Sequence, residues 1–380
     1  MHSQRHLFDL PEDVHYLNGA YMSPLMKPVQ EAGMAGIKRK ANPSALFATD
    51  YFNEAVVAKE LFSRIVQCTP KQVAIIPSAS YGIKAAVNNV PPGNGTNAIT
   101  VSEEFPSGYY SVKEWCKKNG KTLKVVSAPA STFNRGKLWN ENLLESINKD
   151  TSMVVISSIH WNDGTLFNLE EIGTRCREVG AIFIVDGTQS VGALPIDVMC
   201  CKIDALVCAA YKWLMAPYTI GLAYYSEYFD NGNPLEDVWL NKPDSEDFPN
   251  ITQYKDGYRE GAARYSMGEH SNFILLPMLI RALEQIHTWG IDAIQEYCFS
   301  LVQPLMQFLQ EKNYWVEEPS CRASHLFGCL PPPSVDKQLK FQQLLEHKVF
   351  VSLRGGGFRV SPYLYNTEND IAAMMEVLNK

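Results

Sequence analysis

The feature that most constrains the fold of this chain is an alternation of short apolar runs with amphipathic helical patterns. Runs rich in β-branched residues occur at 72–77, 97–101, 121–126, 152–158, 181–186, 204–209 and 220–225. Continuous apolar strands that alternate with helices are typical of a mainly parallel sheet covered on both faces. We therefore predict an α/β fold with a mainly parallel seven-stranded sheet, in which ligands bind beyond the carboxyl ends of the strands.

The helical patterns that accompany these runs lie at 53–67, 107–119 and 168–179. In the first of them, Val57, Leu61 and Ile65 are expected to share the buried face. After about residue 260 the pattern changes to two long helical stretches, a few strand candidates and a last helix, at 272–289, 291–312 and 367–379. We predict two domains: an N-terminal arm with the large domain over 1–258, and a smaller α+β domain over 259–380.

Composition excludes several classes of function. A formal net charge of −7 and no basic stripe argue against nucleic-acid binding. The longest apolar run, 273–280, is far shorter than a membrane span, and the first residues lack the apolar core of a signal peptide. The nine cysteines are scattered, and Cys208 and Cys298 lie in apolar runs as small hydrophobic residues do. We expect a cytoplasmic protein without a nucleic-acid or membrane partner.

Two charged residues stand at the ends of predicted strands. Asp186 ends the run 181–186, and Lys212 follows the run 204–209 among apolar neighbours. Burying an ammonium is costly unless it is paired or loses its charge, and a desolvated lysine has a lowered pKa and can act as a nucleophile. A lysine that forms a Schiff base and a carboxylate that keeps a pyridine nitrogen protonated are what pyridoxal phosphate (PLP) chemistry needs.

Longer motifs around these residues resemble the class V aminotransferase family of fold-type I PLP enzymes, whose superfamily includes cysteine desulfurases, isopenicillin-N-epimerase-like proteins and kynureninases. The most specific are "VDGTQSVGALPIDV" (185–198), "AAYKWLMAPYTIGLAYY" (209–225) and "RVSPYLYNTENDI" (359–371). The resemblance begins at "HYLNGAYMSPL" (15–25) and so extends over nearly the whole chain. It implies PLP as the cofactor and an amino acid and a keto acid as ligands.

The resemblance also implies roles for single residues. Lys212 resembles the Schiff-base lysine, Asp186 the partner of the pyridine nitrogen, and Gln189 the side chain that contacts the ring hydroxyl. The phosphate is expected where "PSASYGI" (77–83) opens a helix, because free backbone N–H groups and the helix dipole favour an anion there. The residues expected at the phosphate are Ser78, Ala79, Ser80 and Tyr211.

The segments on either side of the expected cofactor ring are less well determined. Phe105 is expected to stack on the ring, with core packing as the alternative. In 157–169, any of His160, Trp161 and Asn162 could contact the cofactor, and His160 could instead be a buried structural histidine or a general acid or base. No further ligand stands at metal-binding spacing, so no metal is expected.

The C-terminal motif carries two candidate carboxylate-binding arginines. Arg359 matches the family's carboxylate-binding position, whereas Arg354 precedes a flexible Gly355–Gly357 run that could close over the substrate. Asn18 on the N-terminal arm is a further substrate-binding candidate. The resemblance implies a homodimer, in which Gly268 and Glu269 would approach the neighbour's phosphate.

At several positions this chain differs from the named branches of the family, and these differences argue against some of their reactions. The stretch 351–362 lacks the nucleophilic cysteine of cysteine desulfurases, which also carry histidine where this chain has Tyr211. Kynureninase-like and epimerase-like members usually carry histidine at the position of Gln189. An aminotransferase is therefore the default prediction. A β-lyase or kynureninase-type hydrolase is the alternative, and a PLP-binding protein without turnover is a remoter one.

Overall fold

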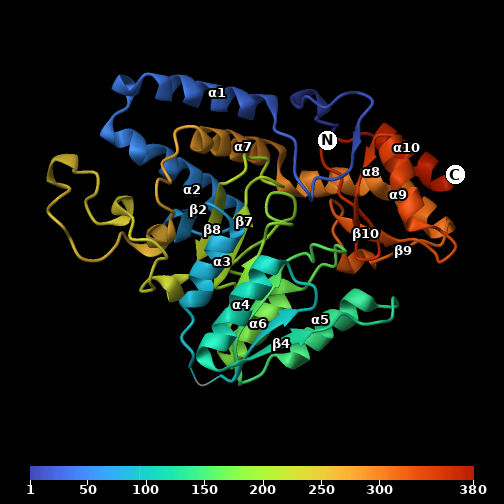
Figure 1. The fold of residues 1–380 in the computed structure, drawn as a ribbon, viewed down its shortest axis with the longest axis horizontal. Coiled ribbons are helices and arrows are strands. Elements are labelled where there is room, and N and C mark those ends of the chain that lie inside the picture. The colour runs from blue at the N-terminus through green and yellow to red at the C-terminus, as the bar shows by residue number, and fades with distance from the viewer. Residues whose placement is uncertain (94) are drawn as a thin grey trace.

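The computed structural model describes residues 1–93 and 95–380, and its centre is a seven-stranded sheet (Figure 1). The strand order is β2-β8-β7-β6-β5-β3-β4, and β8 runs antiparallel to both of its neighbours while all other pairs are parallel. The bounds are β2 Val73–Ile76, β3 Asn97–Val101, β4 Thr122–Val126, β5 Thr151–Ser157, β6 Ile182–Asp186, β7 Ala205–Ala209 and β8 Gly221–Tyr225. The predicted α/β fold and its sheet are thus confirmed.

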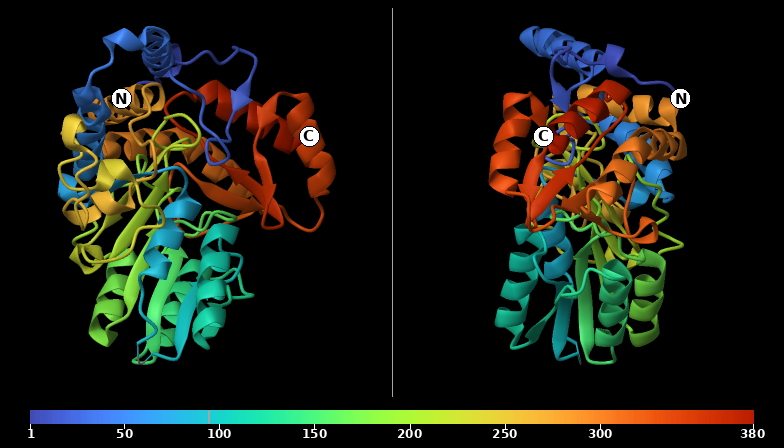
Figure 2. Two further views of the ribbon diagram at one scale, coloured as in Figure 1. Left: turned by 60° about the vertical axis from the view of Figure 1, so that its left-hand side comes forward. Right: turned by 90° about the vertical axis from the view of Figure 1, so that its right-hand side faces the viewer.

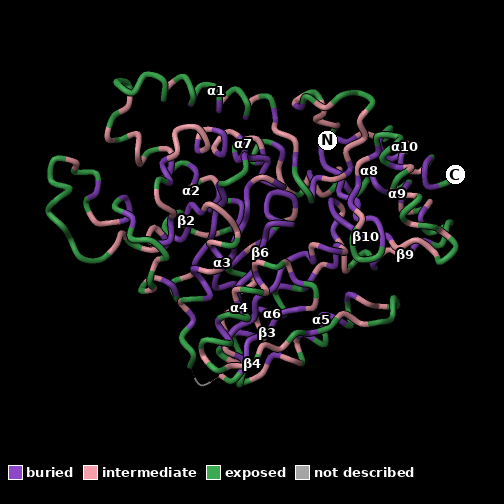
Figure 3. The backbone as a smooth tube through the Cα atoms, viewed as in Figure 1, coloured by how far each residue is buried: buried purple, intermediate pink, exposed green. Residues whose placement is uncertain are grey.

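Helices cover both faces of this sheet. One face packs on α3 (Ala79–Asn88) and α4 (Pro106–Asn119), and the other on α2 (Asn53–Val66), α5 (Arg135–Ser146), α6 (Leu169–Val179) and α7 (Leu275–Trp289). Alternate residues of β5 enter the two cores: Met153 and Val155 face α3 and α4, whereas Val154 and Ile156 face the opposite layer. Six of the seven strands are therefore almost entirely buried (purple in Figure 3), whereas the edge strand β4 is partly exposed.

The predicted buried face of the helix at 53–67 is wrong in part. The core side of α2 is formed by Ala55, Ala58, Phe62 and Ile65, whereas Val57 is 38% exposed. The buried residues are spaced by three and four positions, which keeps their side chains on one side of a helix. The predicted residues were spaced by four each time, and this spacing moves gradually around the helix. Helix α2 packs closely against α7.

Helix α1 (Lys27–Ala41), which is not among the helical patterns described above, lies along α7 at the upper edge of Figure 1. Gly36 is required there, because a Cβ at this position would collide with the carbonyl oxygen of Phe273. Glycine lowers helix propensity, so the residue that permits the close contact also weakens the helical pattern in the sequence.

The C-terminal region contains α8 (Ile291–Glu311), α9 (Lys337–Glu346) and α10 (Glu368–Asn379) around a four-stranded antiparallel sheet. Its strands are β9 (Trp315–Val316), β10 (Phe327–Leu330), β12 (Ser352–Arg354) and β13 (Gly357–Val360), in the order β12-β13-β10-β9. The N-terminal arm joins this region, because β1 (His15–Tyr16) pairs with β11 (Val349–Phe350), as Figure 2 shows. The domain boundary at 258/259 stays a prediction.

Three further observations concern the surface and the core. No helix of the described residues is both long and apolar enough to cross a membrane. The nine cysteines are free thiols, and Cys208 and Cys298 are buried, as predicted. Exposed residues concentrate on outer helices and on the loop at 249–257.

Candidate active site

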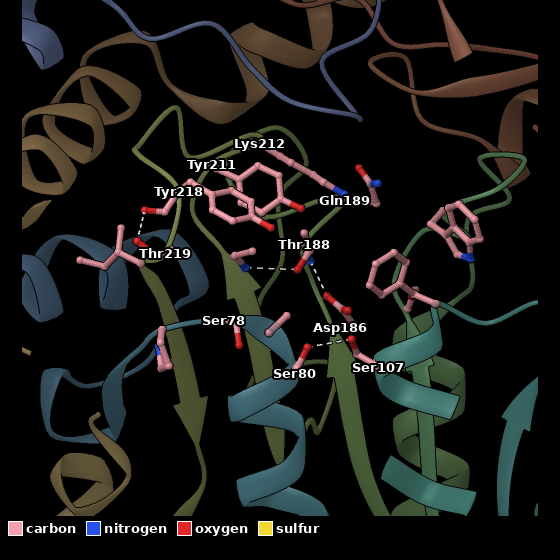
Figure 4. A pocket seen from close by; sticks show the side chains of 17 residues that line it. Ser78, Ser80, Ser107, Asp186, Thr188, Gln189, Tyr211, Lys212, Tyr218 and Thr219 are labelled. Carbon is pink, nitrogen blue, oxygen red and sulfur yellow. Dashed lines mark hydrogen bonds between the residues drawn. The ribbon is translucent and has the colours of Figure 1, made fainter. Parts of the chain in front are cut away.

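A cavity of about 330 Å³ opens where the strands β5, β6 and β7 end and the helices α3 and α4 begin (Figure 4). This is the position at which open α/β sheets bind ligands. Eight of the predicted site residues line the cavity: Ser78, Ala79, Ser80, Phe105, Asp186, Gln189, Tyr211 and Lys212.

Lys212 is a buried amine that no acidic side chain of the described residues pairs with. Its side chain follows β7 and is 7% exposed, and Nζ lies 6.0 Å from the centre of the Phe105 ring and 5.7 Å from that of Tyr211. No carboxylate of the described residues forms an ion pair with it. Burial, followed by the charge of Arg359, lowers the pKa of Lys212 to about 8, although the charge of Asp186 opposes this. At pH 7 about a tenth of this amine is therefore neutral and nucleophilic, far more than for an ordinary lysine with a pKa of 10.5.

Asp186 ends β6 and is likewise buried without a cation within ion-pair distance among the described residues. The backbone N–H of Thr188 donates to its Oδ1 at 2.9 Å. Burial raises the pKa of Asp186, while the hydrogen bonds from Thr188 and the charge of Lys212 act in the opposite direction. The Thr188 hydroxyl accepts from Ala209 N–H at 3.2 Å and so fixes this turn to the end of β7.

Gln189 lies three residues after Asp186, and hydrogen bonds to both the nitrogen and the oxygen of its side-chain amide fix its orientation. Its Nε2 donates to the carbonyl of Ala20 at 3.2 Å, and its Oε1 accepts from Trp213 Nε1 at 3.1 Å. The N-terminal arm therefore holds a side chain that lines the cavity.

The opposite end of the cavity is built from two helix N-termini. Ser78 caps α3 by accepting from Tyr81 N–H at 3.2 Å, and the N–H groups of Ala79 and Ser80 have no acceptor among the described residues. The hydroxyl of Ser80 lies 2.8 Å from that of Ser107, which belongs to the first turn of α4 (Figure 4). Such an end favours an anion through free N–H groups, hydroxyls and the helix dipoles.

Several residues that line the cavity were not singled out from the sequence, namely Ser107, Ser157, Thr188, Tyr218 and Thr219. Ser107 could have been identified from the sequence. A proline marks the first position of a helix, and a serine directly after it places its hydroxyl at the helix N-terminus, as Ser78 and Ser80 do at the start of α3. Tyr218 and Thr219 had none, because they reach the cavity through a loop in which Thr219 adopts φ 67° and Tyr218 packs 4.6 Å from the Tyr211 ring.

Of the three alternatives at 160–162, Trp161 lines the cavity, whereas His160 and Asn162 do not. Trp161 packs edge-on against Phe105, with 5.5 Å between ring centres. Asn162 donates instead to the Glu103 carboxylate at 2.6 Å, and His160 is directed at Asp163 and at the backbone of the Glu103 loop.

Both candidate arginines lie on one face of the β12–β13 hairpin. Ser352 pairs with Arg359 and Arg354 pairs with Gly357, so these positions alternate with the apolar pair Leu353 and Phe358. Arg359 is 2% exposed and donates to the carbonyl of Trp161 at 2.5 Å and to the Ser352 hydroxyl at 3.4 Å, while its Nε has no partner among the described residues.

The two arginines are close enough for their charges to interact. Burial, followed by the charge of Arg354, lowers the pKa of Arg359 to about 10. Arg354 is exposed, and its guanidinium lies 5.4 Å from the centre of the Trp161 ring. Neither arginine is among the residues that line the 330 Å³ cavity, and neither has a carboxylate partner in the described part of the chain.

The remaining predicted residues lie outside the cavity. Asn18 accepts from the hydroxyl of Ser352, the strand partner of Arg359, at 2.8 Å. Gly268 N–H donates to Glu236 at 2.7 Å, and Glu269 lines a separate hollow beside Tyr51. Within residues 1–93 and 95–380, no group of three or more His, Cys, Asp or Glu side chains is arranged to hold a metal ion.

Comparison with known proteins agrees with this geometry. The model of the aminotransferase class-V family matches residues 26–374. The uncharacterized aminotransferase YcbU of Bacillus subtilis is 22% identical over 97% of this chain and 94% of its own length. A probable cysteine desulfurase of Pyrococcus abyssi is 25% identical over 61% of this chain and 60% of its own.

Solved structures share the fold over essentially the full length. A variant of the cystine C–S lyase C-DES, with glycine covalently linked to its PLP cofactor, has a TM-score of 0.86 at 18% identity and covers 98% of both chains. The apo cysteine desulfurase of Thermococcus onnurineus NA1 has a TM-score of 0.82 at 19% identity, covering 100% of this chain and 98% of its own. With a family match over most of its length and the same fold, the chain belongs to the aminotransferase class-V family.

Proposed function

We propose that this protein is a PLP-dependent enzyme that transfers the amino group of an amino acid. The observation that carries the proposal is a pair of buried, oppositely charged groups, Lys212 and Asp186, which face one cavity and are not paired with each other. Leaving both unpaired is costly for the folded protein, so a ligand that engages both is expected.

The residues present fit PLP. The free N–H groups and hydroxyls at the starts of α3 and α4 suit its phosphate, and Phe105 offers an aromatic face for a flat ring. Asp186 would hold the ring nitrogen, Gln189 the ring hydroxyl, and Lys212 the aldehyde carbon. When bound, PLP supplies an electrophilic carbon and a ring that accepts electrons.

The chain's own residues then account for the handling of the substrate. The guanidinium of Arg359 would bind the amino acid's carboxylate through two donors and fix the orientation of the α-carbon. Lys212, freed as a neutral amine, would take the proton from the α-carbon at its Nζ and later release it. The apolar surroundings of Lys212 exclude water and keep the amine's pKa low.

A second candidate reaction is β-elimination, and its support is the likeness to C-DES, which is a cystine C–S lyase. Sulfur transfer by a cysteine on the 351–362 segment is not proposed, because that segment contains no cysteine. Transamination and elimination release different products, so one experiment separates them.

The test is a panel of amino acids incubated with the PLP-loaded protein, with absorbance and mass spectrometry as readouts. Release of a keto acid with conversion of the cofactor to its aminated form supports transamination, whereas ammonia or a side-chain fragment supports elimination.

Borohydride reduction should attach the cofactor to the peptide that contains Lys212, and Lys212→Ala should abolish attachment. Lys59 is the control, since burial lowers its pKa to about 8 too but it lies on α2 outside the cavity. Labelling of Lys59, or of any other lysine in place of Lys212, would refute the assignment.

We further propose a homodimer. Support comes from large apolar side chains that stand exposed on and after α1, namely Met34 (56%), Ile37 (48%) and Phe47 (68%). In this arrangement Gly268 and Glu269 would approach the neighbour's site. Light scattering that finds a fully active monomer would contradict it.

A further inference from the structure

The turn at 160–165 contains a buried histidine whose role the proposed reaction does not explain. His160 is 1% exposed and follows β5 on the loop to α6. Its ring packs 4.9 Å from that of Trp139. The turn closes through His160 N–H, which donates to the Thr165 carbonyl at 2.7 Å, and through Gly164, whose φ is 80°.

Both ring nitrogens of His160 face acceptors. Nδ1 lies 3.0 Å from Asp163 Oδ1, and Nε2 lies 3.2 Å from the carbonyl oxygens of both Ser102 and Glu103. A neutral imidazole carries one N–H, so one nitrogen would present a lone pair to oxygen atoms. Only the doubly protonated ring donates in both directions.

A second buried histidine in the same chain shows the opposite arrangement. His325 Nε2 lies 2.8 Å from the carbonyl of Gln189, but its Nδ1 lies 2.7 Å from the amide nitrogen of Gln295. One side offers an acceptor and the other a donor, which is the pattern of a neutral ring. Burial lowers the pKa of His325 to about 4, in agreement with that pattern.

The charges that face His160 favour its protonated form. Asp163 lies in the same turn as His160, Glu104 lies on the loop before α4, and Arg135 lies on α5. Arg135 binds the oxygen of Asp163 that does not contact His160, at 2.6 Å. Burial by itself lowers the pKa of His160, but the charge and hydrogen bond of Asp163 and the charge of Glu104 outweigh burial and the opposing Arg135, so the pKa lies above its usual value.

The bonds of His160 join two segments of the candidate site. Glu103 has φ 53°, a left-handed conformation that is uncommon for residues with a side chain, and its carbonyl also accepts from Trp161 Nε1 at 2.7 Å. Phe105 follows two residues later and lines the cavity. On the other segment, the carbonyl of Trp161 is the acceptor that holds Arg359 at 2.5 Å.

We propose that His160 is a positioning residue that works as a doubly protonated ring. By donating to Asp163 and to the Ser102 and Glu103 carbonyls, it fixes the loop that carries Phe105 and the turn whose carbonyl holds Arg359. This inference rests on the proposed function for its catalytic consequence, because Arg359 is expected to bind the substrate carboxylate. The charge state of His160 is a property of the chain alone and can be measured without substrate.

The first test is nitrogen NMR of the protein labelled in its eight histidines. At pH 7.5, a pH chosen above the ordinary histidine pKa of about 6.5, His160 should show both ring nitrogens protonated, while His325 should show one of each kind. Assignment uses His160→Gln, which removes the resonance in question. A neutral His160 would overturn the proposal whatever the enzyme's activity.

The second test separates binding from turnover. His160→Leu should raise the KM for the amino acid about tenfold or more while kcat changes less than about threefold, because Arg359 loses its fixed acceptor but Lys212 is untouched. His160→Gln, whose amide can donate to the same carbonyls, should restore KM to within about threefold of the natural protein and serves as the test if the leucine variant does not fold.

The outcomes distinguish this inference from the proposed function. Unchanged KM in a folded His160→Leu protein, with normal cofactor absorbance, refutes the positioning role and leaves the PLP assignment standing. Failure of the natural protein to bind PLP refutes the proposed function, and the NMR result then still decides whether His160 is charged.

Discussion

Replacing the buried amine of Lys212 should make the cofactor-free protein more stable. Burial and the charge of Arg359 lower the pKa of Lys212 from 10.5 to about 8, so at pH 7 the folded state carries a cation that it solvates poorly. One pKa unit corresponds to 1.36 kcal/mol, so a shift of this size penalises the folded state by about 3 kcal/mol. Lys212→Met keeps an unbranched chain of similar length and removes the charge. We expect the variant to gain up to about 3 kcal/mol in free energy of unfolding at pH 7.

The sign of the pH dependence follows from proton binding. Between pH 8 and 10.5 the unfolded chain keeps the Lys212 proton that the folded chain has lost, so the stability of the natural protein rises with pH over this interval. The advantage of Lys212→Met should therefore be largest below pH 8 and vanish near pH 10.5.

Denaturant unfolding of both cofactor-free proteins at several pH values measures this difference. Subtracting one curve from the other cancels the titration of groups that the charge of Lys212 does not affect, and Asp186, which it does affect, titrates below the interval from pH 8 to 10.5 in the unfolded chain. Lys137→Met is the control, because the Lys137 side chain is 69% exposed and its removal should change stability by less than about 0.5 kcal/mol. If Lys212→Met is no more stable than the natural protein at pH 7, or if its advantage does not shrink with rising pH, the amine is not held in a desolvated, destabilised state.

Three further predictions concern the site and the turn beside it. Gly164→Ala should lower the free energy of unfolding by more than Gly180→Ala, which should cost about 1 kcal/mol. Both glycines have positive φ, but only at Gly164 would the added Cβ lie 2.7 Å from the backbone of Phe327. Equal losses of stability in calorimetry would exclude that collision as the cause. Arg359→Lys should raise the amino-acid KM by about tenfold or more with normal cofactor absorbance, because the two-pronged donor is lost; an unchanged KM, with the large rise in Arg354→Lys instead, would transfer carboxylate binding to that residue. Ser107→Ala should weaken PLP binding in equilibrium dialysis by several-fold, corresponding to one lost hydrogen bond of about 1 kcal/mol, whereas Ser107→Thr keeps the hydroxyl and should bind nearly normally; equal affinities of the alanine and natural proteins would remove this serine from the phosphate end.

The parts of the fold that the sequence predicted are those set by local pattern. All seven apolar runs became strands, and all but the edge strand β4 are almost entirely buried, which is why they show as continuous apolar runs in the sequence. Asp186 and Lys212 were identifiable because the first ends such a run and the second follows one, and the carboxyl ends of parallel strands lie at one edge of the sheet. Helix α1 was missed because the glycine that lets it approach α7 is also a poor helix former.

Contacts between distant segments could not be predicted in this way. Which of His160, Trp161 and Asn162 faces the cavity depends on the position and orientation of their turn. The N–H of Gly328 holds that turn by donating to the carbonyl of Asp163 at 2.8 Å. Gly328 lies on β10, more than 160 residues along the chain (328 − 163 = 165), so no local pattern carries the information.

The charges around the cavity suggest why an amino acid would be bound in one orientation. Arg359 and Arg354 both lower the pKa of Lys212, and Asp186 is the carboxylate that opposes them. Arg359 and Arg354 repel one another as well, since the charge of Arg354 lowers the pKa of Arg359. The protein thus holds several cations near one another at a cost in free energy, and anions that bind among them relieve the repulsion. A phosphate at the start of α3 and a carboxylate at Arg359 would do so, and in the proposed function the amine of the substrate would then be directed toward Lys212.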